Sequence, residues 1–198
     1  MLEREEAKEA IQQAVEYHSK GEYEKAFTLM EQALEAGFIP AYTLIGDCYW
    51  NGEGVKADTK KAIQYYLGGA ELGNATALMR MGDIYLQCDE TQKALDSYTK
   101  AAEKGVTDAL FNLGNIYYSG IGGLKRDYSK AAEYFEKYLD IVPDDKEAIY
   151  LLGRCYVFME EHDLLKAEEL FATAASLGNE LAVKDLNTLQ LGGQIIDY

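Results

Sequence analysis

Long apolar runs are missing from this sequence. None approaches the roughly 20 residues that a helix needs to cross a bilayer. The opening residues 1–6 include three acidic side chains, and no apolar stretch follows them, so a secretory signal is not expected. Cysteine is also scarce. Cys48, Cys88 and Cys155 form neither an even framework nor a CxxC pair, so we expect reduced thiols and a cytoplasmic location.

Basic residues are few as well. The chain has 19 lysine and arginine side chains against 34 acidic ones, a net charge of −15. Phosphate contacts need a basic surface, so this balance argues against nucleic acid and against anionic membranes as partners. The carboxylates are spread along the whole chain. We therefore interpret them as a solvated exterior that keeps the protein soluble.

Proline occurs only at Pro40 and Pro143, which favours long helices, and the 18 glycines then need a positional explanation. A repeat supplies one. A Lys-Ala pair that is followed within three positions by a large apolar or aromatic residue occurs five times. The alanines of these pairs are Ala26, Ala62, Ala94, Ala131 and Ala167.

A second signature, Gly-x-x-Tyr, precedes four of these pairs. Its glycines are Gly46, Gly82, Gly114 and Gly153, and Ala14 takes that place in a degenerate first copy. An alanine opens each later copy, five residues before the glycine. These alanines are Ala41, Ala77, Ala109 and Ala148, with Ala182 starting a remnant.

The opening alanine, the glycine and the tyrosine fall on one side of a helix with 3.6 residues per turn. Glycine inside a helix costs about 0.5–1 kcal/mol relative to alanine. Its recurrence indicates that a neighbouring helix passes very close. We expect the alanine of the Lys-Ala pair to be the surface that it meets.

These patterns predict an all-α, right-handed α-solenoid of five helix–turn–helix repeats plus a C-terminal capping helix, with no strand. The single repeat domain 1–198 divides at about 9–40, 41–76, 77–108, 109–147 and 148–181, with a cap and tail at 182–198. Predicted first helices lie near 3–19, 40–51, 76–87, 108–119 and 146–158. Predicted second helices lie near 22–36, 59–72, 91–104, 128–140 and 163–177, and a terminal helix lies near 180–190. Second helices should start at Asp58, Asp127 and Thr91 and end at left-handed Gly37, Gly73, Gly105 and Gly178.

With these residues in view, the chain resembles the Sel-one-like repeat family, a branch of the tetratricopeptide superfamily. The best match is the copy from Ala41 to Ala77, including its loop Gly52-Glu53-Gly54-Val55. Copies one and three lack this loop and are nearer the plain tetratricopeptide form. The resemblance implies an α-solenoid that acts as an adaptor or assembly scaffold.

No residue pattern supports catalysis, a cofactor or a metal. The glycines at 120–123 fall short of a dinucleotide fingerprint, and no strand precedes them, so we interpret both glycine loops as structural turns. His18 and His162 lie four copies apart and are interpreted as exposed residues at helix ends. Cys48 and Cys155 share one repeat position and are expected to be buried, whereas Cys88 is expected to be more exposed.

The resemblance also implies a concave groove lined by the first helices. Its middle row begins with Val15, and its lower row contains His18, Leu86 and Val157. The candidate partner-binding residues are Thr43, Asp47, Trp50, Met79, Asp83, Phe111, Asn115, Tyr118, Tyr150 and Arg154. For each of them, sealing neighbouring repeats is an equally good interpretation. Asp47 and Asp83 would repel a carboxylate, so no clamp for a C-terminal carboxylate is expected.

Two functions follow from this face and from the chain's end. The first is a non-catalytic adaptor that binds a protein or peptide, with Trp50, Tyr118 and Phe111 as anchors. The alternative is a structural subunit that forms a homo-oligomer through terminal repeats or through the apolar tail 189–198. That tail could cap its own array or dock on a neighbour.

Overall fold

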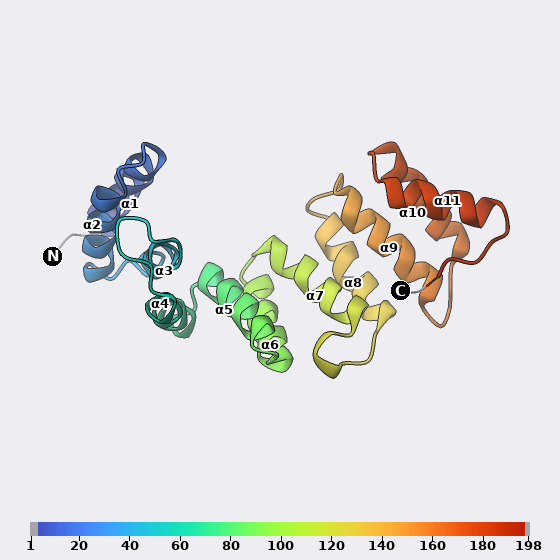
Figure 1. Cartoon of the computed structure of the whole chain (residues 1–198), viewed down its shortest axis with the longest axis horizontal. Coiled ribbons are helices and arrows are strands. Elements are labelled where there is room, and N and C mark those ends of the chain that lie inside the picture. Colours follow the sequence, from blue (N-terminus) through green and yellow to red (C-terminus); the bar gives the residue numbers. More distant parts are fainter. Residues whose placement is uncertain (1–3, 197–198) are drawn as a thin grey trace. The chain divides into compact units, whose positions relative to one another are not determined.

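A computed structural model of the chain describes residues 4–196, and every regular element in that range is helical (Figure 1). The first five helices are α1 (Arg4–Ser19), α2 (Tyr23–Glu35), α3 (Ala41–Asn51), α4 (Thr59–Glu71) and α5 (Ala75–Gln87). The next six are α6 (Thr91–Glu103), α7 (Thr107–Ser119), α8 (Tyr128–Leu139), α9 (Lys146–Phe158), α10 (Leu164–Ser176) and α11 (Glu180–Gln190). A short 3-10 turn, η1 (Ile121–Gly123), follows α7.

The expected helices agree with the observed ones to within one residue at each described end, and the all-α helix–turn–helix prediction is confirmed. The predicted helix start at Glu3 lies outside the described residues, and so do Asp197 and Tyr198 of the predicted tail.

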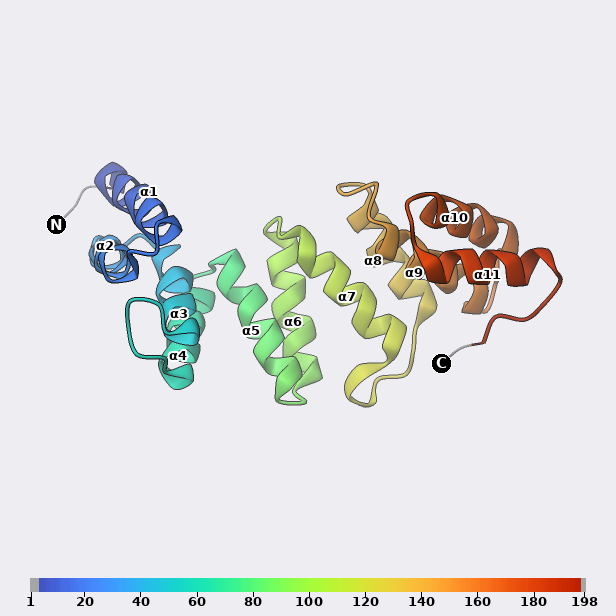
Figure 2. The ribbon, with the colours of Figure 1, turned by 45° about the horizontal axis from the view of Figure 1, so that its top comes forward.

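The helices form two compact units. The first contains α1–α5 and ends at Cys88, and the second contains α6–α11 and begins at Asp89. In the first unit each helix packs on the next along the chain, and α3 also touches α5. In the second unit each helix packs on the next along the chain (Figure 2).

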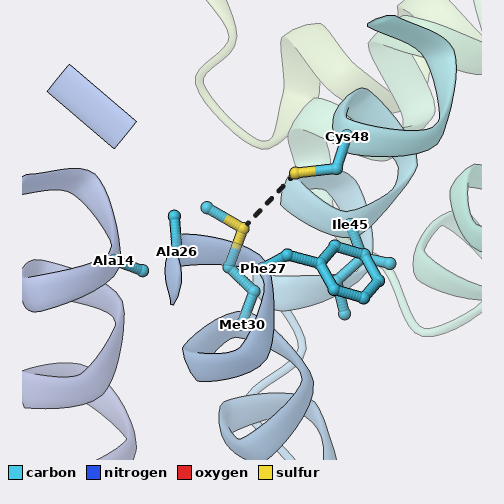
Figure 3. Packing of buried hydrophobic residues seen from close by; sticks show 6 residues of the cluster. All are labelled: Ala14, Ala26, Phe27, Met30, Ile45 and Cys48. Atoms are coloured by element: carbon cyan, nitrogen blue, oxygen red, sulfur yellow. Dashed lines mark hydrogen bonds between the residues drawn. The ribbon is translucent and has the colours of Figure 1, made fainter. Parts of the chain in front are cut away.

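Both alanine series of the repeat lie in the core. The five opening alanines and the five alanines of the Lys-Ala pairs are all 0% exposed. Around them, larger side chains form separate clusters. One cluster joins Phe27 and Met30 of α2 to Ile45 and Cys48 of α3 (Figure 3). Small side chains at fixed positions therefore allow the helices to approach each other, and larger ones fill the space between.

Three of the four signature glycines meet aromatic rings instead of the Lys-Ala alanines, so our expectation about their partner was wrong. A Cβ atom on Gly46 would lie 2.5 Å from the ring of Tyr66. Equivalent atoms on Gly114 and Gly153 would lie 2.7 Å from the rings of Phe135 and Phe171. Each ring belongs to the residue four positions after the Lys-Ala alanine, one turn further along the same face.

Most of the predicted helix ends are confirmed. Gly37, Gly73, Gly105 and Gly178 have φ angles between +76° and +89°. The Asp58 and Asp127 side chains accept hydrogen bonds from backbone N–H groups of α4 and α8.

Thr91 does not cap α6. It is the first residue of that helix, and Glu90 precedes it as the N-cap residue without a side-chain hydrogen bond. The Thr91 hydroxyl is buried without a partner, because the Gly122 backbone lies against it. Packing of the loop therefore determines the position of this side chain.

Candidate interaction site

The first unit contains a pocket of about 530 Å³. Its walls come from all five helices of the unit and from the glycine loop after α3. Val15 and His18 of α1 contribute to one side, and Asp83 and Gln87 of α5 to the other. A pocket of this volume is in the range that accepts a small ligand or a few side chains of a peptide.

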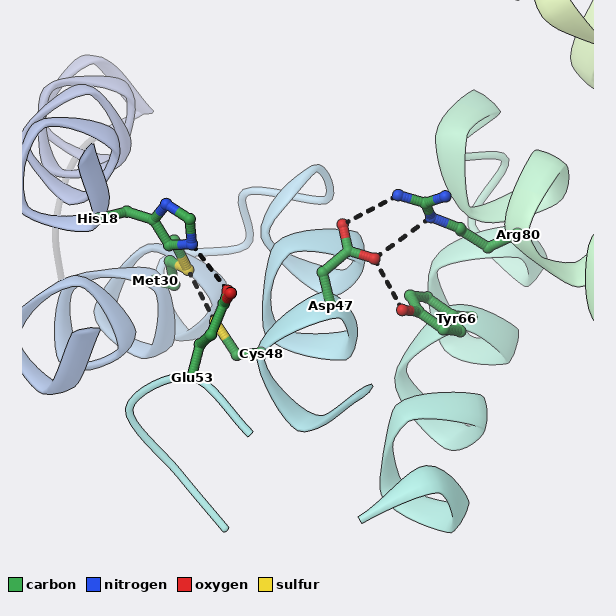
Figure 4. Close-up of polar contacts among 7 residues, drawn as sticks. All are labelled: His18, Met30, Asp47, Cys48, Glu53, Tyr66 and Arg80. Carbon is green, nitrogen blue, oxygen red and sulfur yellow. Dashed lines mark hydrogen bonds and ion pairs between the residues drawn. The ribbon is translucent and has the colours of Figure 1, made fainter. Parts of the chain in front are cut away.

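Asp47 is the polar centre of one wall (Figure 4). The Tyr66 hydroxyl donates a 2.7 Å hydrogen bond to Asp47, and Arg80 Nε of α5 lies 3.2 Å from the same carboxylate. Burial, followed by the hydrogen bond to Asp47, raises the pKa of Tyr66, so the hydroxyl stays protonated and remains a donor. Because Gly46 has no side chain, the Tyr66 ring can lie against α3 and bring its hydroxyl to Asp47.

His18 and Glu53 form the opposite wall. His18 Nε2 lies 2.8 Å from a Glu53 oxygen, and the His18 ring packs edge-on against Tyr23. Glu53 belongs to the glycine loop, which lies on the start of α2, since a Cβ atom on Gly54 would overlap the Tyr23 carbonyl. His18 lies in the last turn of α1 as expected, with 42% of its side chain exposed, but its contact with Glu53 was not expected. The loop brings a carboxylate to it.

The floor of the pocket is apolar. Met30, Leu44, Cys48 and Ile84 line it, and the Cys48 thiol lies 3.8 Å from the Met30 sulfur. Burial, followed by the charges of Glu53 and Asp47, raises the pKa of Cys48 to about 11, so this thiol is protonated and poorly nucleophilic.

Trp50 stands at the pocket with 40% of its surface exposed. It lies on the last turn of α3, just before Gly52 ends the helix in the left-handed conformation. Its ring centre is 6.3 Å from that of Tyr66. A large aromatic side chain that stays half in water beside an apolar floor offers contact area to an occupant.

Three of the predicted residues meet at this pocket, namely Asp47, Trp50 and Asp83. Two others of the first unit do not line it. Thr43 is only 4% exposed, and its hydroxyl bonds to the Asn74 side chain. Met79 is half-buried on α5.

In the second unit, Tyr150 and Arg154 lie together on α9, where Arg154 Nη1 is 3.4 Å from the Tyr150 hydroxyl. Tyr118 is close enough to Arg154 that each affects the pKa of the other. Tyr150 is buried, and its hydroxyl donates to Asp185 of α11.

The two remaining candidates of the second unit lie on α7. The Phe111 ring packs between Phe135 and Tyr138, so it contributes to the core of this unit. Asn115 is half-buried on the same helix.

Glu53, Tyr66 and Arg80 were missed as site residues. The row pattern counts only first-helix positions three before, one after and four after the signature glycine. Arg80 lies two before Gly82, and the other two lie outside first helices. Within 4–196, no group of three or more histidine, cysteine or acidic residues could hold a metal ion. No helix in the same range is long and apolar enough to cross a membrane.

The paired helices and their repeated contacts define a helical-repeat protein of the α-solenoid class. The chain belongs to the Sel1 repeat family, whose model matches residues 16–38, 39–74, 107–137 and 146–179, more than half of the sequence. A tetratricopeptide repeat model matches residues 77–110. Copy three is thus of the plain tetratricopeptide form as expected, whereas copy one matches the Sel1 repeat.

Solved structures of repeat proteins resemble the chain. A Sel1 repeat protein from Oxalobacter formigenes is 29% identical with a TM-score of 0.67, covering 84% of this chain and 69% of its own. The protein c5321, a protective antigen of uropathogenic Escherichia coli, is 25% identical with a TM-score of 0.79. That match covers 95% of this chain and 42% of c5321, so the chain spans less than half of that relative.

A third structure, YrrB, is described as a tetratricopeptide protein with an unusual peptide-binding site. It is 22% identical with a TM-score of 0.60 over 90% of each chain and shows the shared fold alone. None of the curated protein sequences matches the chain. Proteins built from these repeats generally serve as scaffolds for protein–protein interaction.

Proposed function

We propose that this chain is a non-catalytic adaptor that binds a segment of another protein in the pocket of its first unit. The observation that carries the proposal is Trp50, a half-exposed aromatic side chain beside an apolar floor. Tryptophan is among the residues that most often dominate binding energy at protein interfaces. Free, buried Cys48 and Cys155 suit a reducing, cytoplasmic compartment.

The charge of the pocket indicates which segment it favours. Asp47, Glu53 and Asp83 supply three carboxylates, against the single arginine Arg80 and the imidazole of His18. The chain as a whole carries −15. We therefore propose an occupant that places an apolar side chain on the floor and a lysine or arginine near these carboxylates. The same charge disfavours nucleic acid.

Trp50→Ala tests the proposal, and Leu67→Ala is its control. Leu67 lies on α4 of the same unit outside the pocket lining and is 41% exposed, nearly the same as Trp50. Peptides selected from a displayed library on the wild-type chain should combine an apolar with a basic residue. Their affinity should fall at least about tenfold with Trp50→Ala, since hot-spot truncations cost about 2 kcal/mol or more.

Leu67→Ala should leave that affinity unchanged. Enriched peptides that are acidic, or that bind the Trp50→Ala variant as tightly as the wild type, would contradict the proposal. Circular dichroism of both variants checks that helicity is kept.

A second candidate function is self-association through the last repeat. Apolar side chains are exposed on its helices, among them Leu165 of α10 and Leu181 and Val183 of α11. A second copy of this chain could cover them. Sedimentation velocity should then show dimers at high concentration that Leu181→Glu abolishes. A monomer at every concentration for both proteins rules this function out.

A further inference from the structure

The segment after α11 turns back along its own unit. Beyond Gln190 the chain passes through Gly192, whose φ is +71°, and runs back beside α11 (Figures 1 and 2). Arg154 of α9 donates a hydrogen bond from Nη2 to the Ile196 carbonyl, at 2.7 Å. Residues 191–196 therefore contact Arg154, which is one of the predicted partner-binding residues.

Arg154 is held ready for this contact. Its guanidinium lies 5.2 Å from the Phe158 ring centre, and its Nη1 is 3.4 Å from the Tyr150 hydroxyl. That hydroxyl in turn donates to Asp185 of α11 at 3.0 Å. Stacking and hydrogen bonding limit the rotamers of an arginine, so less entropy is lost when it meets an acceptor.

Two neighbouring isoleucines of the segment differ sharply in their surroundings. Ile195 packs against the buried apolar cluster that contains Tyr150 of α9, Phe171 of α10 and Ala182 of α11. Ile196 is 60% exposed, and Leu191 is 87% exposed. The segment is thus anchored by one aliphatic side chain and by one carbonyl on Arg154.

Because its anchor is small, the segment 191–196 is expected to detach from α9 and α11 more easily than the helices unfold. Segments with few buried apolar contacts open at low free energy, well below global unfolding. In addition, the Arg154 Nε is buried without a hydrogen-bond partner, so the segment leaves one donor of this side chain unsatisfied. The contact is therefore one that a competing segment can replace.

We propose that the surface of α9 and α11 around Arg154 is a binding site for an extended protein segment, with residues 191–196 as its displaceable resident. This site should bind a segment that resembles residues 191–196, with an aliphatic side chain followed by a hydrogen-bond acceptor for the Arg154 guanidinium. This site lies in the second unit and is independent of the Trp50 pocket. A partner gains access only when the resident segment leaves.

The resident competes as an intramolecular ligand. A short tether provides an effective concentration of about millimolar, so a partner's apparent affinity is reduced by the fraction of chains whose site is occupied. Weakening the resident should therefore open the site to a peptide added in solution.

The test uses a fluorescein-labelled peptide with the sequence of residues 191–198 and full-length protein. Ile195→Ser removes the anchor of the resident, and Ile196→Ser changes the exposed neighbour as a matched control. By fluorescence anisotropy, Ile195→Ser protein should bind the peptide at least about tenfold more tightly than wild type. The Ile196→Ser protein should behave as wild type, and adding Arg154→Gln to Ile195→Ser should abolish binding.

Equal peptide affinity for wild type and Ile195→Ser, or tight binding that survives Arg154→Gln, would overturn the proposal. Should circular dichroism show that Ile195→Ser is unfolded, a chain ending at Gln190 replaces it with the same expected result. Trp50→Ala in the Ile195→Ser background should leave peptide binding unchanged. That arm separates this site from the adaptor proposal for the first unit.

Discussion

The lysine of the Lys-Ala pair has a role that its recurrence did not explain. In four of the repeats its ammonium group lies over the ring of the signature tyrosine of the same repeat, at 4.2–5.2 Å from the ring centre. The pairs are Lys25 with Tyr17, Lys61 with Tyr49, Lys130 with Tyr117 and Lys166 with Tyr156. Each exposed contact of this kind contributes about 0.5–1 kcal/mol. The pair therefore joins the two helices of a repeat twice, through a buried methyl and a surface cation.

The three cysteines should react at very different rates. Cys88 is exposed, whereas Cys48 and Cys155 are buried and burial raises the pKa of both thiols. With a disulfide reagent at mildly alkaline pH, we expect rapid reaction of Cys88 alone, since the thiolate is the nucleophile. Cys88→Ser should abolish the rapid phase in the native protein. Rapid labelling that persists in this variant would show that the core is open.

Glu136 should make stability depend on acidity. Burial raises the pKa of this carboxyl, but hydrogen bonds from Tyr156 and Lys166 outweigh it, and the pKa is lowered overall. A lowered pKa gives stability that is full above the unfolded value of about 4.3 and is lost as pH falls through the folded pKa.

Wild type should therefore exceed Glu136→Gln in stability at neutral pH, and urea titrations should show this difference shrinking below about pH 4. Glu133→Gln, which removes a more exposed carboxylate paired with Lys137, is the control with a smaller effect. A wild-type advantage that stays constant on acidification would contradict the assignment.

At the scale of elements, the two glycine loops share one packing rule. Each lies on the first residue of the second helix of the preceding repeat. Gly54 meets the backbone of Tyr23 in α2, and Gly122 meets Thr91 in α6. A loop inserted between the two helices of one repeat therefore covers the start of the second helix of the preceding repeat. In the first unit, this position brings Glu53 to His18.

Gly122 and Gly123 form a matched pair for testing this packing. Both have positive φ, +66° and +80°, so alanine is conformationally strained at either position. A Cβ atom on Gly122 would overlap the Thr91 side chain, whereas one on Gly123 meets nothing within 4 Å. Gly122→Ala should lower the free energy of unfolding by about 1–3 kcal/mol more than Gly123→Ala, because overpacking adds to the strain.

Chemical denaturation followed by circular dichroism measures that difference. Adding Thr91→Ala to Gly122→Ala should recover part of it. Equal losses for the two alanine variants would mean that the loop does not pack on α6.

At the scale of the whole molecule, the chain holds two compact units and one tryptophan. Trp50 lies in the first unit, so its fluorescence reports on that unit, whereas circular dichroism reports on all helices. In repeat proteins each repeat interacts mainly with its neighbours, so a local change need not affect distant repeats equally.

We predict that Gly114→Ala and Gly46→Ala separate these two signals. Each would place a Cβ atom within 2.7 Å of an aromatic ring, Gly114 in the second unit and Gly46 in the first. Each should cost about 1–3 kcal/mol. Gly46→Ala should lower the unfolding midpoint seen by Trp50, and Gly114→Ala should lower mainly the midpoint seen by circular dichroism. Equal shifts of both signals in both variants would indicate a single cooperative unit.

The sequence by itself determined the helices and the repeat, because both depend on spacings within one or two turns. Small residues recur at fixed helical positions, and glycine or aspartate marks most helix ends, so each boundary follows from nearby residues. The same row rule selected Asp47, Trp50 and Asp83, and the structure places these three residues at one pocket of the first unit.

Only the tertiary structure decided what those residues contact. His18 and Glu53 are 35 positions apart, and Arg154 and Ile196 are 42 apart. The spacing of neither pair follows the helical period. A loop brings Glu53 to His18, and the segment after α11 brings Ile196 to Arg154. Thr43 and Tyr150 follow the row rule, yet they are buried because Asn74 and Asp185 lie against them. Local periodicity predicts the direction in which a side chain points. Whether that side chain is covered depends on residues that are far away in the sequence.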